Sequence, residues 1–464
     1  MSAVAKPIHK RELFGHPVGL YILFFTEMWE RFSYYGMRAL FTLFLVAETT
    51  SNNPGFGWTN EEALALYGWY TMLVYISSVP GGWIADRLLG QKKTVMLGGA
   101  LLCIGHAVLA LNSETTFYIG CLFVIMGVGC LKPNISSMVG GLYKPKDERR
   151  DLGFYIFYMG INIGGFLAPI LCGWVGETYN WHYGFGLAAI GMFLGQAVYI
   201  WGQKFIPHVG NLISRKNEAD RAILDRPLTS IEKDRVKVLL LSFLLIILFW
   251  AAFEQAGGLM NLYASQKTDR NFFGLFEIPA SVFQSVNSFF IITLATAVGA
   301  FWLRWRKKGK EASSLFKMAV GLIIMALGFG FMTAASVEYD NTGSSAMYWL
   351  ILAYLFHTIG ELCASPVSLS FITKLAPLKY ASIIMGLYWA ATGLGNKVAG
   401  LIGEASQELG EFEIFLGITI VWSLIGLIVI ALLKPLKRLT HGAEEGEGKV
   451  DDADEVEGFE VEKA

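Results

Sequence analysis

The chain has 464 residues, of which 54% are hydrophobic and only 16% carry a charge. Soluble globular domains average roughly 25% charged residues, so the composition excludes an ordinary soluble enzyme. The 51 glycines are enriched inside apolar stretches, and glycine-rich apolar helices are typical of membrane proteins.

Twelve apolar stretches follow one another along the chain, each near the roughly 20 residues that a membrane-crossing helix needs. After residues 1–17, six of them fall within 18–206, a polar linker occupies 207–235, and six more fall within 236–436. We therefore expect an all-α integral membrane protein with 12 transmembrane helices in two six-helix bundles. The expected spans are residues 18–46, 63–88, 94–112, 116–140, 151–176, 183–205, 236–262, 279–303, 314–336, 345–374, 380–404 and 412–434.

Lys and Arg are concentrated in every second loop. Among the alternate loops, only 263–278 holds any, Lys267 and Arg270. By the positive-inside rule, both termini and the central linker face the cytoplasm. The expected location is therefore the inner or plasma membrane of the cell. The basic segments are the N-terminus, Arg87 with residues 91–93, residues 144–150, the linker, residues 304–310, Lys374 with Lys379, and residues 434–438.

The first expected helix carries charges that a lipid-facing helix would not tolerate. Glu27, Glu30, Arg31, Tyr34 and Arg38 recur at offsets of 3, 4, 7 and 11, which places them in one stripe. An ionised side chain near the bilayer centre costs at least ~2.5 kcal/mol, so the stripe faces either a wet cavity or opposite charges. The structural alternative is a self-neutralising Glu27–Arg31 pair, which leaves Glu30 and Arg38 unexplained.

Charged residues also lie inside later spans, and Lys132, Glu254 and Glu361 are singled out among them. The two glutamates belong to the second half of the chain, opposite the basic residues of the first half. Ion pairs that form and break between two mobile bundles would bias a transporter between its states. The alternative is a set of fixed salt bridges that lock the bundles together.

The layout of six spans, linker and six spans resembles the major facilitator architecture, in which two bundles move about a site near the midplane. Residues 81–93, GGWIADRLLGQKK, resemble that family's loop between helices two and three. Here we expect a glycine to allow close helix approach, and an acid and bases to bridge the bundles in one state. The matching positions are Gly82, Asp86, Arg87, Gly90, Lys92 and Lys93.

Residues 27–35, EMWERFSYY, resemble the ExxERFxYY motif of the proton-dependent oligopeptide transporters, a branch of the major facilitators. Further matches are GxxKPN ending at Asn134, FYMGINIGG at 157–165, FWxxxEQ ending at Gln255 and GELxxSP ending at Pro366. Because these matches span most of the chain, it is identified as a member of this family.

The resemblance implies proton-driven uptake of di- and tripeptides by alternating access. It implies that Arg31 and Lys132 hold the peptide carboxylate, and that Glu361 with Asn162 holds the amino end. The remaining peptide-binding positions that it implies are Tyr34, Tyr35, Tyr67, Trp250, Ser365, Tyr388 and Trp389. The implied proton-coupling residues are Glu27, Glu30, Arg31 and Glu361, and the implied gating salt bridges involve Arg38, Glu254, Lys132 and Glu361.

Elementary chemistry agrees with this assignment. An extended zwitterion of two or three residues spans about 7 to 11 Å. A cavity with basic residues on one side and acidic residues on the other would therefore bind both of its charged ends. Our mechanistic hypothesis is that protonating a helix-one glutamate frees Arg31 for the substrate carboxylate. Glu361 would then alternate between Lys132 and the substrate amine.

Two features depart from many family members. The linker is too short and too polar for the two extra helices that many bacterial relatives insert. In MGLYWAATGLGN, Tyr388 stands where a tryptophan is common, and Trp389 follows it. Neighbours on a helix point about 100° apart, so the sequence leaves open which of the two faces the substrate.

The last 24 residues differ from the rest in charge. Residues 441–464 hold ten acidic residues and two lysines, which leaves the rest of the chain with 35 basic and 28 acidic residues, a net charge of +7. Too little apolar surface is present there to offset the ordering entropy. We expect residues 437–464 to form an acidic, disordered cytoplasmic tail, and we expect no nucleic-acid partner.

Catalytic and metal-binding patterns are not recognisable in the sequence. His357 and Glu361 are four residues apart, but no third ligand follows, and hydrolase, dinucleotide and ATPase fingerprints are missing. The cysteines lie in apolar segments without a CxxC pair, which predicts buried free thiols. We expect no enzyme activity, cofactor or metal, and a functional monomer in the lipid bilayer. The five cysteines are Cys103, Cys121, Cys130, Cys172 and Cys363.

Three other functions compete with peptide symport. A related proton-coupled facilitator for nitrate, an amino acid or a drug-like compound would tend to lack the ExxER signature. An intramembrane enzyme would need a nucleophile or a metal set. A non-transporting sensor or scaffold would not need acidic and basic groups in both halves.

Overall fold

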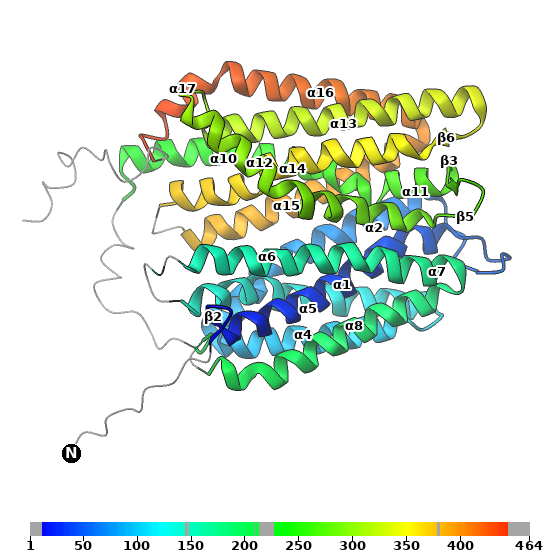
Figure 1. Ribbon diagram of the computed structural model, residues 1–464, viewed down its shortest axis with the longest axis horizontal. Coiled ribbons are helices and arrows are strands. Elements are labelled where there is room, and N and C mark those ends of the chain that lie inside the picture. Colours follow the sequence, from blue (N-terminus) through cyan, green and yellow to red (C-terminus); the bar gives the residue numbers. More distant parts are fainter. Residues whose placement is uncertain are drawn as a thin grey trace, which may run out of the picture.

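The computed structural model describes residues 12–143, 147, 149–207, 209–212, 227–377 and 381–443, and leaves out the side chains of residues 151 and 381–383. The axes of the long helices are roughly aligned with one another (Figure 1). The first half of the chain lies below the second half in Figure 1. Most of the expected N-terminal segment, the middle of the linker and the acidic tail from residue 444 lie outside the described residues.

The twelve expected stretches fall on single helices or on consecutive runs of helices. The first half comprises α1 (Val18–Val46), α2 (Asn60–Ile76), α3 (Ser78–Ile84), the π-helix η1 (Ala85–Leu89), α4 (Gln91–Leu109), α5 (Glu114–Gly141), α6 (Arg149–Ala168), the π-helix η2 (Pro169–Gly173), α7 (Trp174–Thr178), α8 (Trp181–Gly202) and η3 (Gln203–Phe205). The second half comprises α10 (Ser230–Phe253), η4 (Glu254–Ala256), α11 (Leu259–Gln266), η5 (Ala280–Gln284), α12 (Ser285–Lys307), α13 (Ser314–Thr342), α14 (Met347–Leu375), α15 (Ala381–Leu409), α16 (Glu411–Ala431) and α17 (Leu433–Arg438).

Nine helical stretches within the described residues are long and apolar enough to cross a membrane. The other three candidates are α1, which carries at least three charges in every 18-residue window, α2, which has 17 residues, and the more polar α15. An integral membrane protein is therefore established, while the count of twelve crossings stays a prediction, as do the expected limits of the two bundles.

Local sequence explains where several helices begin and end. Thr59 and Thr229 form capping boxes with the glutamate three residues later, which satisfies free N–H groups at the starts of α2 and α10. Gly343 adopts a φ of 82° after the last turn of α13, a conformation that favours glycine. Pro133 and Pro366 lie inside α5 and α14, which membrane helices tolerate better than soluble ones do.

Close packing joins the helices within and between the halves. In the first half, α1 packs against α6 and α8, and α4 packs against α5; in the second, α13 packs against α14 and α16. Across the halves, α2 packs against α15 and α6 against α12. The α2–α15 contact depends on small residues, because a Cβ added at Gly68 would lie 2.9 Å from the Cα of Gly400.

Gly81, next to Gly82 of the motif, makes a close approach to α5. A Cβ added at Gly82 would meet nothing within 4 Å, whereas one added at Gly81 would overlap the backbone of Gly129 in α5. Successive residues on a helix point in directions about 100° apart, so only one of the two glycines can face α5.

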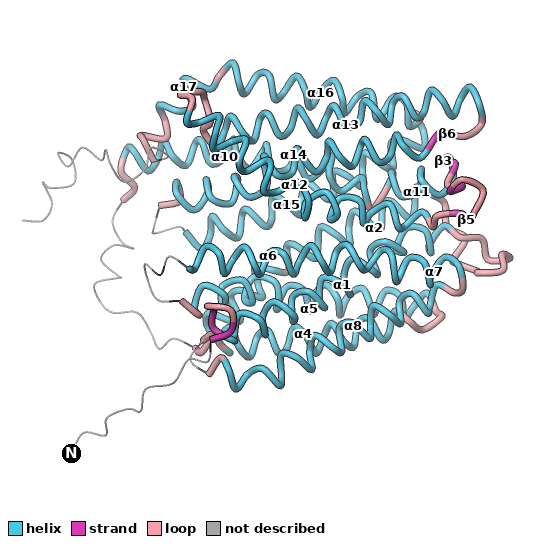
Figure 2. Tube along the Cα trace, in the orientation of Figure 1, coloured by secondary structure: helices cyan, strands magenta, loops and turns pink. Residues whose placement is uncertain are grey.

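Within the described residues, three pairs of two-residue strands lie at the two ends of the bundle (Figure 2), and the sequence did not predict them. At one end, β1 (Glu12–Leu13) pairs with β2 (His16–Pro17). At the opposite end, β3 (Thr268–Asp269) pairs in parallel with β6 (Ser345–Ala346), and β4 (Asn271–Phe272) forms a hairpin with β5 (Phe276–Glu277).

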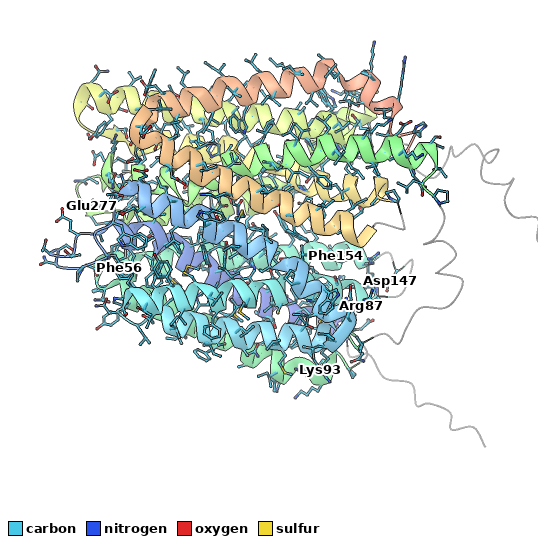
Figure 3. The ribbon with its side chains drawn as sticks, turned by 180° about the vertical axis from the view of Figure 1, so that it is seen from behind. Phe56, Arg87, Lys93, Asp147, Phe154 and Glu277 are labelled. Atoms are coloured by element: carbon cyan, nitrogen blue, oxygen red, sulfur yellow. The ribbon has the colours of Figure 1, made fainter. Side chains whose placement is uncertain are left out.

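The start of α10, the strand β2 and α17 all lie at one end of the molecule (Figure 1), which we call the linker end. Arg87 and Lys93 lie at this end too, whereas Phe56 and Glu277 lie at the opposite, far end (Figure 3). Both ends of the described chain and the residues that flank the linker thus lie on the same side. That this side is cytoplasmic stays a prediction from the positive-inside rule.

Candidate functional site

The charges of the first helix form a compact buried cluster. The Nε of Arg31 lies 3.2 Å from Oε1 of Glu27, and its Nη2 donates a 2.8 Å hydrogen bond to Oε1 of Glu30. A second, shorter contact joins Arg31 Nε to Glu30 Oε2, and all three side chains are at most 4% exposed. The guanidinium carbon also lies 5.2 Å from the ring centre of Tyr34 and 5.9 Å from that of Tyr35. The Arg31 guanidinium is therefore the ion-pair partner of both the Glu27 and the Glu30 carboxylates.

A second buried ion pair connects the halves. Arg38 Nε lies 3.0 Å from Oε1 of Glu254, and Arg38 also donates a 2.8 Å hydrogen bond to the hydroxyl of Tyr67. That hydroxyl in turn donates to Glu254. The glutamate lies in η4, where α10 gives way to a short 3-10 turn before α11. Glu30 and Arg38 are thus both engaged, which a Glu27–Arg31 pair alone does not explain.

Lys132 lies among aromatic rings at the interface of the two halves. Its ammonium is 3.8 Å from the ring centre of Tyr75 and 5.0 Å from that of Trp389. Tyr75 stacks on Trp389 at 6.0 Å and lies 6.4 Å from Trp250. Among the described residues, no carboxylate lies within ion-pair distance of this ammonium. Ring faces therefore make the direct contacts of this ammonium group.

The rotation of α15 gives residues 388 and 389 different surroundings. Trp389 faces Lys132 and Tyr75 and is half-buried, while Tyr388 is 4% exposed and lies beside Ser368 of α14. Trp389 therefore faces the cationic group, and Tyr388 belongs to the packed interior of the second half.

Glu361 lies in α14 and is held by a neutral partner. Asn287 of α12 donates a 2.9 Å hydrogen bond to its Oε2 and a 3.0 Å bond to Thr358. Glu361 and Lys132 are not paired in this conformation, and Asn162 bonds the carbonyl of Tyr158 at 2.9 Å instead of reaching Glu361. The implied Lys132–Glu361 salt bridge is therefore not formed in this conformation, and the joint role of Asn162 and Glu361 at a peptide amine stays a prediction.

Ser365 lies one turn further along α14. With Trp250 it lines a small hollow between α10, α13 and α14, whose other walls are mostly apolar. Both expected residues thus border the same space, on the second half only.

The sequence reading missed two polar features inside the membrane helices. Asn287, which holds Glu361, is an amide in an otherwise apolar span and was detectable for that reason. Lys397 pairs with Glu404 at 3.2 Å on α15, and its ammonium lies 4.9 Å from the ring centre of Trp69 on α2. A lysine in the middle of a predicted span was the available signal.

Comparison with known proteins identifies the family. A family model described as "POT family" matches residues 92–226 and 221–412. The chain belongs to the POT family. This POT chain is 36% identical over 499 residues to "Peptide transporter YePEPT" of Yersinia enterocolitica, with 94% of this chain and 97% of that protein covered. It is 33% identical over 488 residues to the "Di-/tripeptide transporter" of Lactococcus lactis, with 93% and 98% covered.

The structure of this POT chain is similar to a crystal structure of "peptide transporter POT in complex with sulfate". The TM-score is 0.85, the sequence identity is 34%, and the match covers 93% of this chain and 97% of the other. The expected major facilitator fold is therefore confirmed.

Proposed function

We propose that this protein takes up di- and tripeptides together with protons by alternating access. The observation that carries the proposal is a pair of opposite charges on the two halves. Lys132 in the first half has no acid within ion-pair distance among the described residues, and Glu361 in the second has an amide as its partner. The named relatives, a peptide transporter and a di-/tripeptide transporter, support the same substrate class.

A free peptide complements these two charges. Its carboxylate would bind Lys132 and its ammonium Glu361, and an extended chain of two or three residues spans about 7 to 11 Å. Trp389, Tyr75 and Trp250 lie beside the cationic end, where their faces would accept varied side chains. Recognition of both termini by charge would select peptide length and tolerate most sequences.

The α1 cluster supplies a route for proton coupling. Because Glu27 and Glu30 share Arg31, protonating either one weakens its hold on the guanidinium. Arg31 would then add a second cation to the site of the substrate carboxylate. Replacing Glu27 or Glu30 by Gln should abolish accumulation against a gradient while sparing peptide counterflow. Concentrative uptake by both variants would refute this role.

The conformation is closed at the far end. Hydrogen bonds and ion pairs between the halves, within the described ranges, run from the Glu254 bridge to the far end, including Thr42 to the Gly257 carbonyl at 3.2 Å and Asn261 to the Ala39 carbonyl at 3.0 Å. With the linker end cytoplasmic, this would be a state closed to the outside. Pairing of Lys132 with Glu361 would belong to the opposite state.

The deciding experiment uses purified protein in liposomes. Uptake of labelled dialanine would be measured with and without an inward proton gradient, in competition with free amino acids, tripeptides and tetrapeptides. We expect accumulation that depends on the gradient and is inhibited by di- and tripeptides alone. Folded protein that transports no peptide would overturn the proposal in favour of a related facilitator for another small solute.

The remaining parts of the proposal concern enzyme activity, membrane location, orientation and oligomeric state. We propose a transporter without enzyme activity, located in the cell membrane with both termini cytoplasmic and active as a monomer. The apolar helices and the family support the membrane location. The basic residues at the linker end support the orientation.

A further inference from the structure

At the far end, one carboxylate of the first half reaches into the second half. Glu177, in α7, accepts hydrogen bonds from the backbone N–H groups of Ala280 and Ser281 at 2.9 and 2.8 Å, and from the Ser281 hydroxyl. Ala280 and Ser281 open η5, which leads into α12. The glutamate thus satisfies free donors at the start of a helix that belongs to the other bundle.

Arg270 strengthens this contact from the loop that precedes η5. Its guanidinium lies 2.6 Å from Glu277 and 4.0 Å from Glu177, and it donates a 2.8 Å hydrogen bond to the carbonyl of Ile278. The loop 263–278 was the single far-end loop with basic residues, and both of these are paired, since Lys267 contacts Glu411 at 2.7 Å. Arg270 is therefore used in a contact between the halves.

The first-half side of the contact is fixed to its own bundle. Asn53 donates to the Gly176 carbonyl at 2.8 Å and accepts from the N–H of Trp181 at 3.1 Å, which ties the end of α7 to the first half. A further ring contact at 5.6 Å joins Trp174 to Phe276 of the hairpin. The halves therefore cannot separate at the far end unless the bonds of Glu177 break.

We propose that Glu177 is a latch, by which we mean a side chain whose bonds hold the two halves together at the far end. Glu177 must release Ala280, Ser281 and Arg270 before this transporter can open to the outside. The latch holds the halves together independently of the Arg38–Glu254 bridge, because it acts on α7 and η5 and not on α1 and η4. The inference rests on the proposed alternating-access function, but its test does not require peptide.

The test measures how far the halves separate at the far end. Asn52→Cys and Ser344→Cys place spin labels on exposed loops of the first and second halves, and the five native cysteines are buried. Distances between the labels would be recorded by pulsed electron resonance in liposomes without substrate. The variants are Glu177→Gln, the milder Ser281→Ala, and the control Glu114→Gln, which alters an exposed acid at the start of α5.

We expect Glu177→Gln to raise the ratio of long to short distances by about tenfold, the effect of losing roughly 1.4 kcal/mol of charged hydrogen bonding. Ser281→Ala should shift the ratio in the same direction by less, and Glu114→Gln should not shift it. Unchanged distances in folded Glu177→Gln, or in Ser281→Ala if the first variant does not fold, would overturn the latch. An equal shift in the control would also overturn it.

The two proposals fail separately. A shift toward long distances in a protein that transports no peptide would leave the latch standing and remove the peptide assignment. Peptide uptake by a protein whose label distances do not change in Glu177→Gln would support the peptide assignment and overturn the latch.

Discussion

Tyr67 and Tyr70 form a matched pair that tests how much the buried bridge between the halves contributes. Both lie in α2, both are at most 2% exposed, and both rings contact Phe41, at 5.7 and 5.0 Å between centres. The Tyr67 hydroxyl lies between Arg38 and Glu254. The Tyr70 hydroxyl has no hydrogen-bond partner in the described part of the chain. Replacing each tyrosine by Phe removes one hydroxyl group. The hydroxyl of Tyr67 is bonded to charged groups, and that of Tyr70 has no partner within the described residues.

The expected magnitudes follow from those settings. A hydrogen bond to a charged group contributes about 1.5–3 kcal/mol. The Tyr67 hydroxyl makes two, but Arg38 and Glu254 keep their direct contact at 3.0 Å. We therefore expect Tyr67→Phe to lower the free energy of unfolding by about 1.5–3 kcal/mol, a 10- to 150-fold change in the folded-to-unfolded ratio. Tyr70→Phe should be neutral or slightly stabilising, because it removes a buried hydroxyl that gains no bond.

Denaturant titration of both variants in detergent, followed by tryptophan fluorescence, would measure the two free energies. Because ring packing is preserved in both, a general loss of packing cannot produce a difference between them. Equal losses in the two variants would refute the view that the Tyr67 hydroxyl stabilises the bridge.

The site geometry makes two further predictions, each read by transport in liposomes. Arg31→Lys keeps the charge but loses the planar guanidinium that contacts Glu30 through two nitrogens, so proton-driven uptake should fall by at least about tenfold in folded protein; wild-type uptake would contradict this. Trp389→Ala removes a ring beside Lys132, and a cation–π contact of about 0.5–2 kcal/mol implies a roughly two- to thirtyfold higher KM for peptide. Tyr388→Phe should leave KM unchanged, and a larger effect at Tyr388 than at Trp389 would reverse the assignment of the two residues.

Helix positions were readable from the sequence because they depend on local composition. The first expected span, 18–46, coincides with α1, and the limits of the others fall within six residues of helix ends. The charged stripe on α1 was also readable, since residues three and four apart share one face of a helix. The Glu27–Arg31 contact therefore follows from spacing, whereas the contact of Arg31 with its neighbour Glu30 appears only in the fold.

Pairings between distant helices were not readable in the same way. The sequence placed Glu254 and Arg38 in different halves, and the family resemblance paired them, but the part of Tyr67 in that bridge appears only in the fold. The Glu177 contact with η5 was not foreseen, because nothing local distinguishes a glutamate at a helix end that caps another helix from one that faces solvent. Asn287 and Lys397 were missed although each is a polar residue within an expected span.

The sequence by itself determined that this is a helical membrane protein, where its helices run, and which residue types form the α1 cluster. Only the tertiary structure decided how each helix is rotated: that Trp389 and not Tyr388 meets Lys132, that Gly81 and not Gly82 meets α5, and that Glu361 is held by Asn287. The physical reason is that lipid accepts apolar side chains as readily as the protein interior does. A membrane helix is therefore apolar on most sides, and its rotation is set by a few close contacts with other helices.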